Sequence, residues 1–129
     1  PSVKKFITPL PLEWASEKNV VEEGCFEVEY LRPFDAVLVC PATLNTIVKS
    51  ALGIADNAVT LLIASQWTTA EVLFVPTMNL QMWEHPRFSE HEATLKKFGA
   101  RFYPMKAEED RLKMPPPEKV VQWLIQELK

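Results

Sequence analysis

Two apolar runs, each followed by a proline, dominate the pattern of hydrophobic positions along the chain. Residues 35–40 read Asp-Ala-Val-Leu-Val-Cys before Pro41, and residues 72–75 read Val-Leu-Phe-Val before Pro76. Short continuous apolar runs, without alternation, are typical of parallel strands that are buried on both faces. We therefore predict two such strands, each stopped by its proline.

Segments of helical composition separate and surround these two runs. Residues 46–51 and 57–63 are expected to be helices, with Gly53 as the C-cap of the first and Asp56 at the start of the second. The remaining pattern predicts a helix over about 8–17, a turn over 79–86, a helix over 89–98 stopped by Gly99, a strand over 100–103, and a helix over 118–128 whose apolar stripe is Val120, Val121, Leu124 and Leu128. Strands that alternate with helices predict one α/β domain over residues 1–129, a doubly wound, Rossmann-like parallel sheet with helices on both faces.

Composition narrows the classes of partner and location. The net charge is −3 and the 14 basic residues are spread along the 129-residue chain, so no concentrated cationic surface for nucleic acid is expected. The longest apolar stretch, residues 58–65, is far shorter than the roughly 20 residues that span a bilayer. Cys25 and Cys40 have neither metal-site nor redox-pair spacing, and His85 and His91 have no accompanying cluster of ligands. These features predict a cytoplasmic protein with no membrane segment and no metal site.

Polar side chains follow each predicted strand. Residues 41–46, Pro-Ala-Thr-Leu-Asn-Thr, offer hydroxyls, a carboxamide and the amides of a helix N-terminus, which suit a phosphate or a polar ring edge. Residues 76–83, Pro-Thr-Met-Asn-Leu-Gln-Met-Trp, offer a second carboxamide beside thioether and indole groups. Because ligands bind beyond the carboxyl ends of the strands in such sheets, both segments are candidates for one site.

Each candidate also has a structural explanation. Asn45 could cap the helix that follows it, and Asn79 could be an ordinary turn residue. Met78, Met82 and Trp83 are expected to pack rather than to take part in chemistry. Residues 106–113 are expected to form a solvated loop, and Cys40 to be inert because burial raises the pKa of a thiol.

Taken together, the two segments resemble the motifs of the flavin-dependent cysteine decarboxylases. Residues 41–57 look like the family segment P-A-S/T-A-N-T…G-I/L-A-D-N, and residues 76–83 look like P-x-M-N-x-x-M-W. Residues 4–9, 98–104 and 114–129 are similar to other family segments, so the resemblance covers almost the whole chain. It implies an FMN-dependent decarboxylase of a cysteinyl substrate, similar to the phosphopantothenoylcysteine decarboxylases of coenzyme A biosynthesis, and a homotrimer or larger assembly.

The resemblance also implies roles for individual residues. The cysteine side chain would be oxidised to a thioaldehyde by FMN, after which carbon dioxide leaves. Asp56 would brace the cofactor loop, Asn79 would hold the substrate carboxylate or its neighbouring amide, and Met78 and Met82 would lie beside the substrate. The residues expected to contact FMN are Thr8, Pro41, Ala42, Thr43, Asn45 and Thr46.

Three departures from the family pattern bear on function. The first strand, phosphate loop, helix and second strand of the family have no counterpart before Pro1, so we expect an N-terminal fragment or a companion chain to complete the sheet. Glu27 stands where the family has its catalytic histidine, and a carboxylate is a poor base beside an anionic substrate. Residues 106–113 lack the cysteine and glycines of the family's substrate clamp, so decarboxylation should stop at the ene-thiol.

The sequence therefore leaves three functions open. The first is decarboxylation of a cysteinyl substrate at FMN, with Asn79 and Glu27 as candidate catalytic residues. The second is a non-catalytic flavoprotein, or a regulatory or interaction subunit, that kept the fold and lost the chemistry. The third is a flavin reductase or electron carrier.

Overall fold

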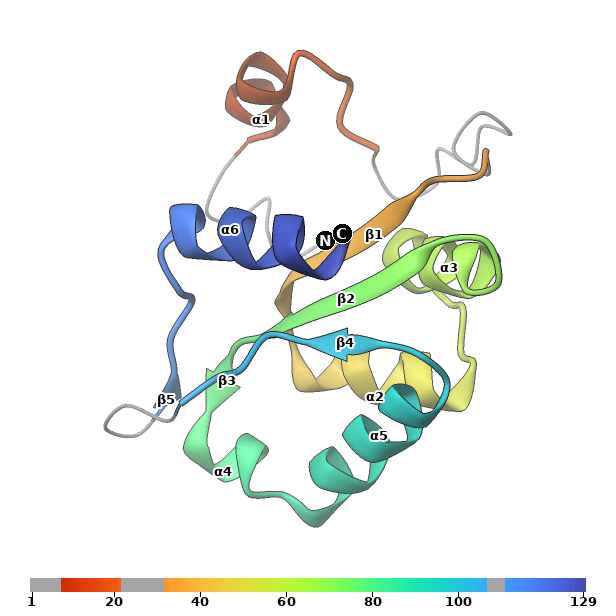
Figure 1. Ribbon diagram of the computed structural model, residues 1–129, viewed down its shortest axis with the longest axis vertical. Coiled ribbons are helices and arrows are strands. Elements are labelled where there is room, and N and C mark those ends of the chain that lie inside the picture. The colour runs from red at the N-terminus through yellow and green to blue at the C-terminus, as the bar shows by residue number, and fades with distance from the viewer. Residues whose placement is uncertain (1–7, 22–31, 107–110) are drawn as a thin grey trace.

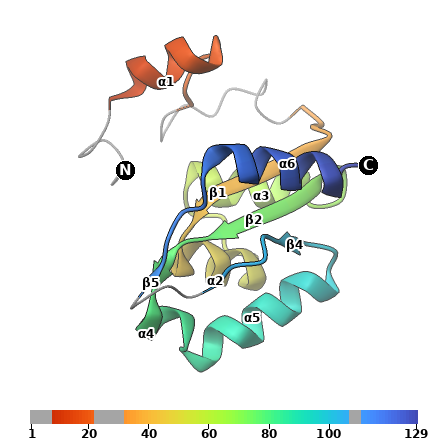
Figure 2. The same cartoon turned by 60° about the vertical axis from the view of Figure 1, so that its left-hand side comes forward.

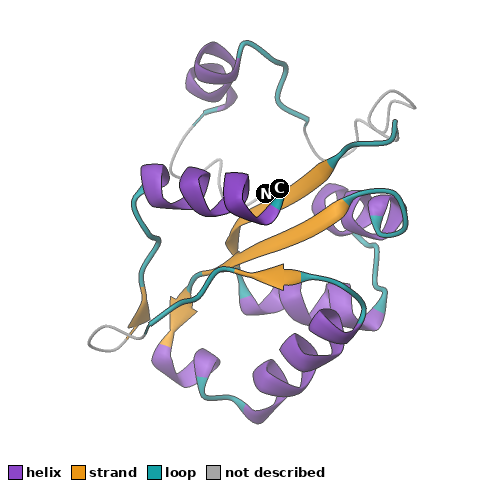
Figure 3. Ribbon diagram, in the orientation of Figure 1, coloured by secondary structure: helices purple, strands orange, loops and turns teal. Residues whose placement is uncertain are grey.

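The computed structural model describes residues 8–21, 32–106 and 111–129 and shows the predicted alternation of helices and strands (Figure 3). In chain order the elements are α1 (Pro9–Ser16), β1 (Ala36–Ala42), α2 (Leu44–Leu52), α3 (Ala58–Gln66), β2 (Glu71–Pro76), β3 (Met78–Asn79), α4 (Leu80–Trp83), α5 (Pro86–Lys97), β4 (Arg101–Phe102), β5 (Arg111–Leu112) and α6 (Pro117–Glu127).

The main sheet is parallel and has the order β1-β2-β4 (Figure 1). Strands β1 and β2 pair from Ala36 opposite Glu71 onward, and β4 joins the other edge of β2 with Leu73 opposite Arg101. A separate ribbon of two short antiparallel strands, β3 and β5, lies beyond the carboxyl ends of β1 and β2. The predicted α/β fold with a parallel sheet is confirmed.

Two apolar cores form because successive side chains of β2 point to opposite faces of the sheet. Val72 and Phe74 belong to the larger core, which lies under α2, α3 and α5, whereas Leu73 and Val75 pack against α6. Figure 2 shows α6 and α5 on opposite sides of the strands. The prediction of helices on both faces is therefore confirmed, and β2 is buried on both faces as expected.

Strand β1 differs from the prediction, because only one of its faces is well covered. Val37 and Val39 are buried in the larger core, but Leu38 on the opposite face is 37% exposed. Within the described residues β1 is an edge strand, and α6 packs mainly over β2. Helix α1, which has no buried residue, stands apart from the sheet and does not cover this face (Figures 1 and 2).

Several predicted boundaries were wrong for local physical reasons. Strand β1 does not stop at Pro41 but continues to Ala42 through a bulge and a cis Cys40–Pro41 peptide bond, and a bulge is a place where a strand tolerates proline. Helix α3 is capped by Asn57 rather than started by Asp56, since Asn57 Oδ1 accepts a hydrogen bond from Thr60 N at 3.0 Å. The two predicted glycine stops are confirmed, and both glycines have positive φ, 71° at Gly53 and 98° at Gly99.

The helices in the C-terminal half of the chain also differ in their bounds from the prediction. The predicted turn over 79–86 contains the short helix α4, and α5 begins at Pro86 rather than at residue 89. On α6 the buried residues are Val120 and Trp123, whereas Val121 is 52% exposed. The predicted stripe is therefore correct at Val120 and Leu124, which pack in the core under α6, and wrong at Val121 and Leu128, which are exposed. No helix of the described residues is long and apolar enough to cross a membrane.

Candidate functional site

The two polar segments that follow β1 and β2 meet at one edge of the sheet, which we call the carboxyl edge (residues 43–46 and 77–82). Ala42 is opposite Pro76 in the ladder, and the main-chain N–H of Thr77 donates to the carbonyl oxygen of Ala42 at 2.9 Å. One backbone hydrogen bond thus joins the start of one motif to the start of the other. In Figure 1 this edge lies where β1 and β2 run towards β3 and α4.

Helix α2 begins at the carboxyl edge and presents a polar first turn. Thr43 is its N-cap, because Thr43 Oγ1 accepts from Thr46 N at 3.4 Å and lies 3.3 Å from Thr46 Oγ1. Asn45, in the first turn, is exposed, and its side chain makes no hydrogen bond with another described residue. The alternative in which Asn45 caps the helix is therefore wrong, and its carboxamide is available to a ligand.

Asn79 starts the short helix α4 on the other side of the carboxyl edge. Its Oδ1 accepts a hydrogen bond from Met82 N at 2.9 Å and so caps α4. Its Nδ2 has no hydrogen-bond partner among the described residues. The oxygen of the Asn79 carboxamide thus has the structural role that the turn interpretation expected. The amide nitrogen remains free to donate to a ligand.

The other residues of the second motif divide into core and surface. Met78 is 7% exposed and belongs to the larger core, and the Trp83 ring packs against Phe88 with centroids 4.6 Å apart. The prediction that these two side chains pack in the protein is therefore confirmed. Met82 is 45% exposed beside Asn79 and stays a candidate for contact with a substrate.

Residues 111–112 form a strand at the carboxyl edge, contrary to the expectation of a solvated loop over 106–113, of which residues 107–110 lie outside the described part of the chain. Strand β5 pairs with β3, so that Leu112 is opposite Met78 and Arg111 is opposite Asn79. Just after β5, the sulfur of Met114 lies 3.6 Å from Cys40 Sγ and 3.9 Å from Thr77 Oγ1. The expectation failed because strand pairing with β3 is a contact between segments far apart in the sequence, which no local pattern announces.

Some predicted site residues lie elsewhere. Thr8 is exposed at the start of α1, away from the carboxyl edge, and Glu27 lies outside the described residues. Pro41 is exposed, whereas the side chain of Ala42 is fully buried, so Ala42 could meet a ligand only through its backbone. Their contacts with a cofactor stay predictions.

Asp56 joins two helices rather than reaching the carboxyl edge. Its Oδ2 lies 2.6 Å from Lys49 Nζ near the end of α2, and its Oδ1 accepts from Asn57 Nδ2 at 3.2 Å. The hydrogen bond from Lys49 is the main cause that lowers the pKa of Asp56 below its ordinary value. Any bracing of the cofactor loop by Asp56 would therefore act through the position of α2.

Cys40 does not have the environment of a reactive thiol. It is partly buried, and this burial raises its pKa, which agrees with the expected inertness. Among the described residues, no group of three His, Cys, Asp or Glu side chains could hold a metal ion.

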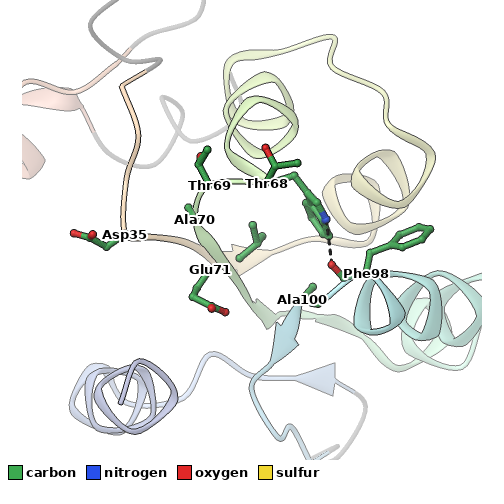
Figure 4. Close-up of a pocket in the computed structure, with 10 residues that line it drawn as sticks. Asp35, Thr68, Thr69, Ala70, Glu71, Phe98 and Ala100 are labelled. Atoms are coloured by element: carbon green, nitrogen blue, oxygen red, sulfur yellow. Dashed lines mark hydrogen bonds between the residues drawn. The ribbon is translucent and has the colours of Figure 1, made fainter.

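A hollow that the sequence did not indicate lies at the opposite, amino edge of the sheet (Figure 4). Its volume is about 390 Å³, and its lining includes Asp35, Glu71 and Ala100, where the strands begin. Trp67 is another lining residue, and its Nε1 donates to the carbonyl oxygen of Phe98 at 3.3 Å. None of the predicted site residues lines this hollow, so it is distinct from the carboxyl edge.

Comparison with known proteins gives a consistent set of relatives. The chain is 34% identical over 131 residues to the coenzyme A biosynthesis bifunctional protein CoaBC of Thermococcus kodakarensis, covering 96% of this chain and 32% of that protein. It is 42% identical over 87 residues to the phosphopantothenoylcysteine decarboxylase of Mus musculus, covering 67% of this chain and 42% of that enzyme. The chain thus spans less than half the length of either relative.

The fold has a solved counterpart in the epidermin biosynthesis protein EpiD from Staphylococcus aureus. The TM-score is 0.75 at 27% sequence identity, and the match covers 93% of this chain and 77% of EpiD. The family model described as Flavoprotein matches residues 2–129, which is almost the entire chain. On this evidence the chain belongs to the Flavoprotein family.

Proposed function

We propose that this chain binds FMN at the carboxyl edge and decarboxylates a cysteinyl substrate by flavin-mediated oxidation of the thiol. The observation that carries the proposal is the hydrogen bond from Thr77 N to Ala42 O, which brings the two motif segments into one site. Membership of the Flavoprotein family and the decarboxylases among the relatives support the same reaction class.

The first turn of α2 fits the polar parts of FMN. Thr43, Asn45 and Thr46 present hydroxyl and carboxamide groups, and the first N–H groups of a helix have no intrahelical acceptor. Such an N-terminus favours an anionic or electron-rich ligand atom. When bound, FMN would supply the two-electron oxidation of the substrate's cysteine side chain.

Asn79 is suited to hold the substrate on the other side of the site. Its Oδ1 is engaged by Met82 N, so the carboxamide is fixed in orientation and its Nδ2 can donate to a carboxylate or a peptide oxygen. Holding the carboxylate while the neighbouring thiol meets the flavin would orient the bond that breaks.

Replacing Asn45 with Ala should weaken FMN binding by about tenfold while leaving the fold intact, because one net hydrogen bond contributes about 1 kcal/mol. The side chain of Asn45 makes no hydrogen bond within the described chain, so its loss leaves no internal partner unsatisfied. The quenching of FMN fluorescence on titration measures the affinity. Asn19→Ala, at another exposed asparagine, is the matched control, and equal losses in both variants would argue against a cofactor role for Asn45.

Asn79→Asp should separate the structural role of this residue from its role in binding. Aspartate is as good an N-cap as asparagine, so the unfolding free energy should stay within about 0.5 kcal/mol of the wild type. Release of carbon dioxide from a cysteinyl peptide should fall by about 100-fold, because the amide donor is replaced by a like charge. Asn19→Asp carries the same change of charge and should retain the activity; full turnover by Asn79→Asp would contradict the assignment.

The second function, a flavoprotein without catalysis, is favoured by one feature, the glutamate at position 27. On this alternative the wild type binds FMN but does not turn over, and Glu27→His restores activity, since a histidine with pKa near 6.5 is a better acid and base at neutral pH. The gain should be about 100-fold or more. Glu29→His is the control, and a wild-type enzyme that is fully active and impaired by Glu27→His would exclude the alternative. A flavin reductase or electron carrier has no specific observation in its favour.

We further propose that a strand of an N-terminal fragment or companion chain pairs with the edge of β1 that has no partner strand among the described residues. An exposed apolar edge strand would otherwise favour pairing with other chains. A denaturing mass spectrum of the purified, flavin-containing protein should then show a second small polypeptide. A single, stable 14.8 kDa species with full FMN occupancy would contradict the proposal.

The homotrimer and the cytoplasmic location stay predictions.

A further inference from the structure

Helix α2 carries the polar first turn of the proposed cofactor site, and few side chains hold this helix to the core. Of its nine residues only Ile47 is fully buried, while Leu44 and Ala51 are partly buried against the same core. A helix of this length is not stable by itself in water, so its position depends on its contacts with the rest of the chain. The contacts at the far end of α2 therefore bear on the orientation of its first turn.

Lys49 ties the far end of α2 to the connection that leads into α3. Its Nζ lies 2.6 Å from Asp56 Oδ2, and the two side chains are 25% and 51% exposed. The backbone makes a second link, because the N–H of Ile54 donates to the carbonyl oxygen of Lys49 at 2.9 Å. Lys49 thus holds the connection through both its side chain and its main chain.

The acid of this ion pair is itself held by the start of α3. Asp56 Oδ1 accepts a hydrogen bond from Asn57 Nδ2 at 3.2 Å. Asn57 is the N-cap of α3 and exchanges two hydrogen bonds with Thr60, which is only 2% exposed. The carboxylate that Lys49 meets therefore has a fixed place relative to the core.

Lys49 also stands directly behind the polar first turn of α2. Asn45 and Thr46 precede it by four and three residues, and side chains at these spacings are neighbours on one face of a helix. The hydroxyl of Ser50 donates to the carbonyl oxygen of Thr46 at 2.7 Å, which joins the first turn to the end of the helix once more. A displacement of the Lys49 end of α2 would therefore move the groups that face the cofactor.

We propose that Lys49 is a positioning residue for the cofactor: its ion pair with Asp56 holds the first turn of α2 in the orientation that binds FMN, and Lys49 itself does not touch FMN. Groups that already stand in the bound orientation need less ordering when the ligand arrives, so the ligand binds more tightly. If only part of the population has that orientation, the affinity falls by the same fraction. The inference rests on the proposed binding of FMN at the carboxyl edge and adds to it a residue outside the contact surface.

The test measures the affinity of the purified protein for FMN by the quenching of flavin fluorescence. Lys49→Gln and Asp56→Asn should each weaken binding by about fourfold, because a partly exposed ion pair has a modest effect on an equilibrium. The double variant Lys49→Gln/Asp56→Asn should bind as weakly as either single variant and no more weakly, since all three lack the same link.

A matched control separates this role from a general loss of stability. Glu92→Gln neutralises the partner of Lys96 in another ion pair, 2.8 Å long, on α5. Urea unfolding of each variant gives its stability, and the titrations use conditions in which every variant is folded. Glu92→Gln should keep the affinity of the wild type for FMN, and an equal loss of affinity in Glu92→Gln and Lys49→Gln would overturn the proposal.

The signs of the two single effects distinguish positioning from direct contact. If the Lys49 ammonium group bound the phosphate of FMN, Lys49→Gln would weaken binding, but Asp56→Asn would strengthen it by releasing the cation to the ligand. Opposite signs would therefore overturn the positioning role, and so would unchanged affinity in both variants; in either case the proposed function stands. If the wild type does not bind FMN, the proposed function itself is overturned, and the role of Lys49 with it.

Discussion

The parallel pairing of β1 with β2 is the constraint on which the rest of this structure depends. The two strands pair from Ala36 opposite Glu71 to Ala42 opposite Pro76, with a bulge after Val39, and the last link is the hydrogen bond from Thr77 N to Ala42 O. Since β2 is buried on both faces, this pairing is held between two apolar cores. This pairing brings the polar segments that follow the two strands together at the carboxyl edge.

The same pairing explains why the two edges of the sheet differ in character. At the carboxyl edge a bulge in β1 precedes a capped helix, so hydroxyl, amide and backbone groups converge there. At the amino edge the strands begin with Asp35 and Glu71 beside the C-terminal ends of α3 and α5, which carry partial negative charge. An electron-rich cofactor is therefore better accommodated at the carboxyl edge than at the hollow on the opposite side.

One departure of this chain from the family pattern concerns charge around the anionic substrate that we propose. The resemblance puts Glu27 at the position of a histidine, which adds a negative group and weakens acid–base chemistry at neutral pH. The residue at position 27 is therefore the point at which the two proposed functions, a decarboxylase and a flavoprotein without catalysis, differ.

The sequence by itself determined the fold class, the two parallel strands β1 and β2, the two glycine stops and the two segments that form the carboxyl edge. These features are local, because apolar runs, prolines and glycines act on the backbone within a few residues of themselves. Tertiary structure alone decided that Thr43 rather than Asn45 caps α2, that Asn79 divides its carboxamide between a cap and a free donor, and that Met114 contacts Cys40. It also decided that Arg111 is opposite Asn79, since strand register depends on contacts between distant segments that no local pattern encodes.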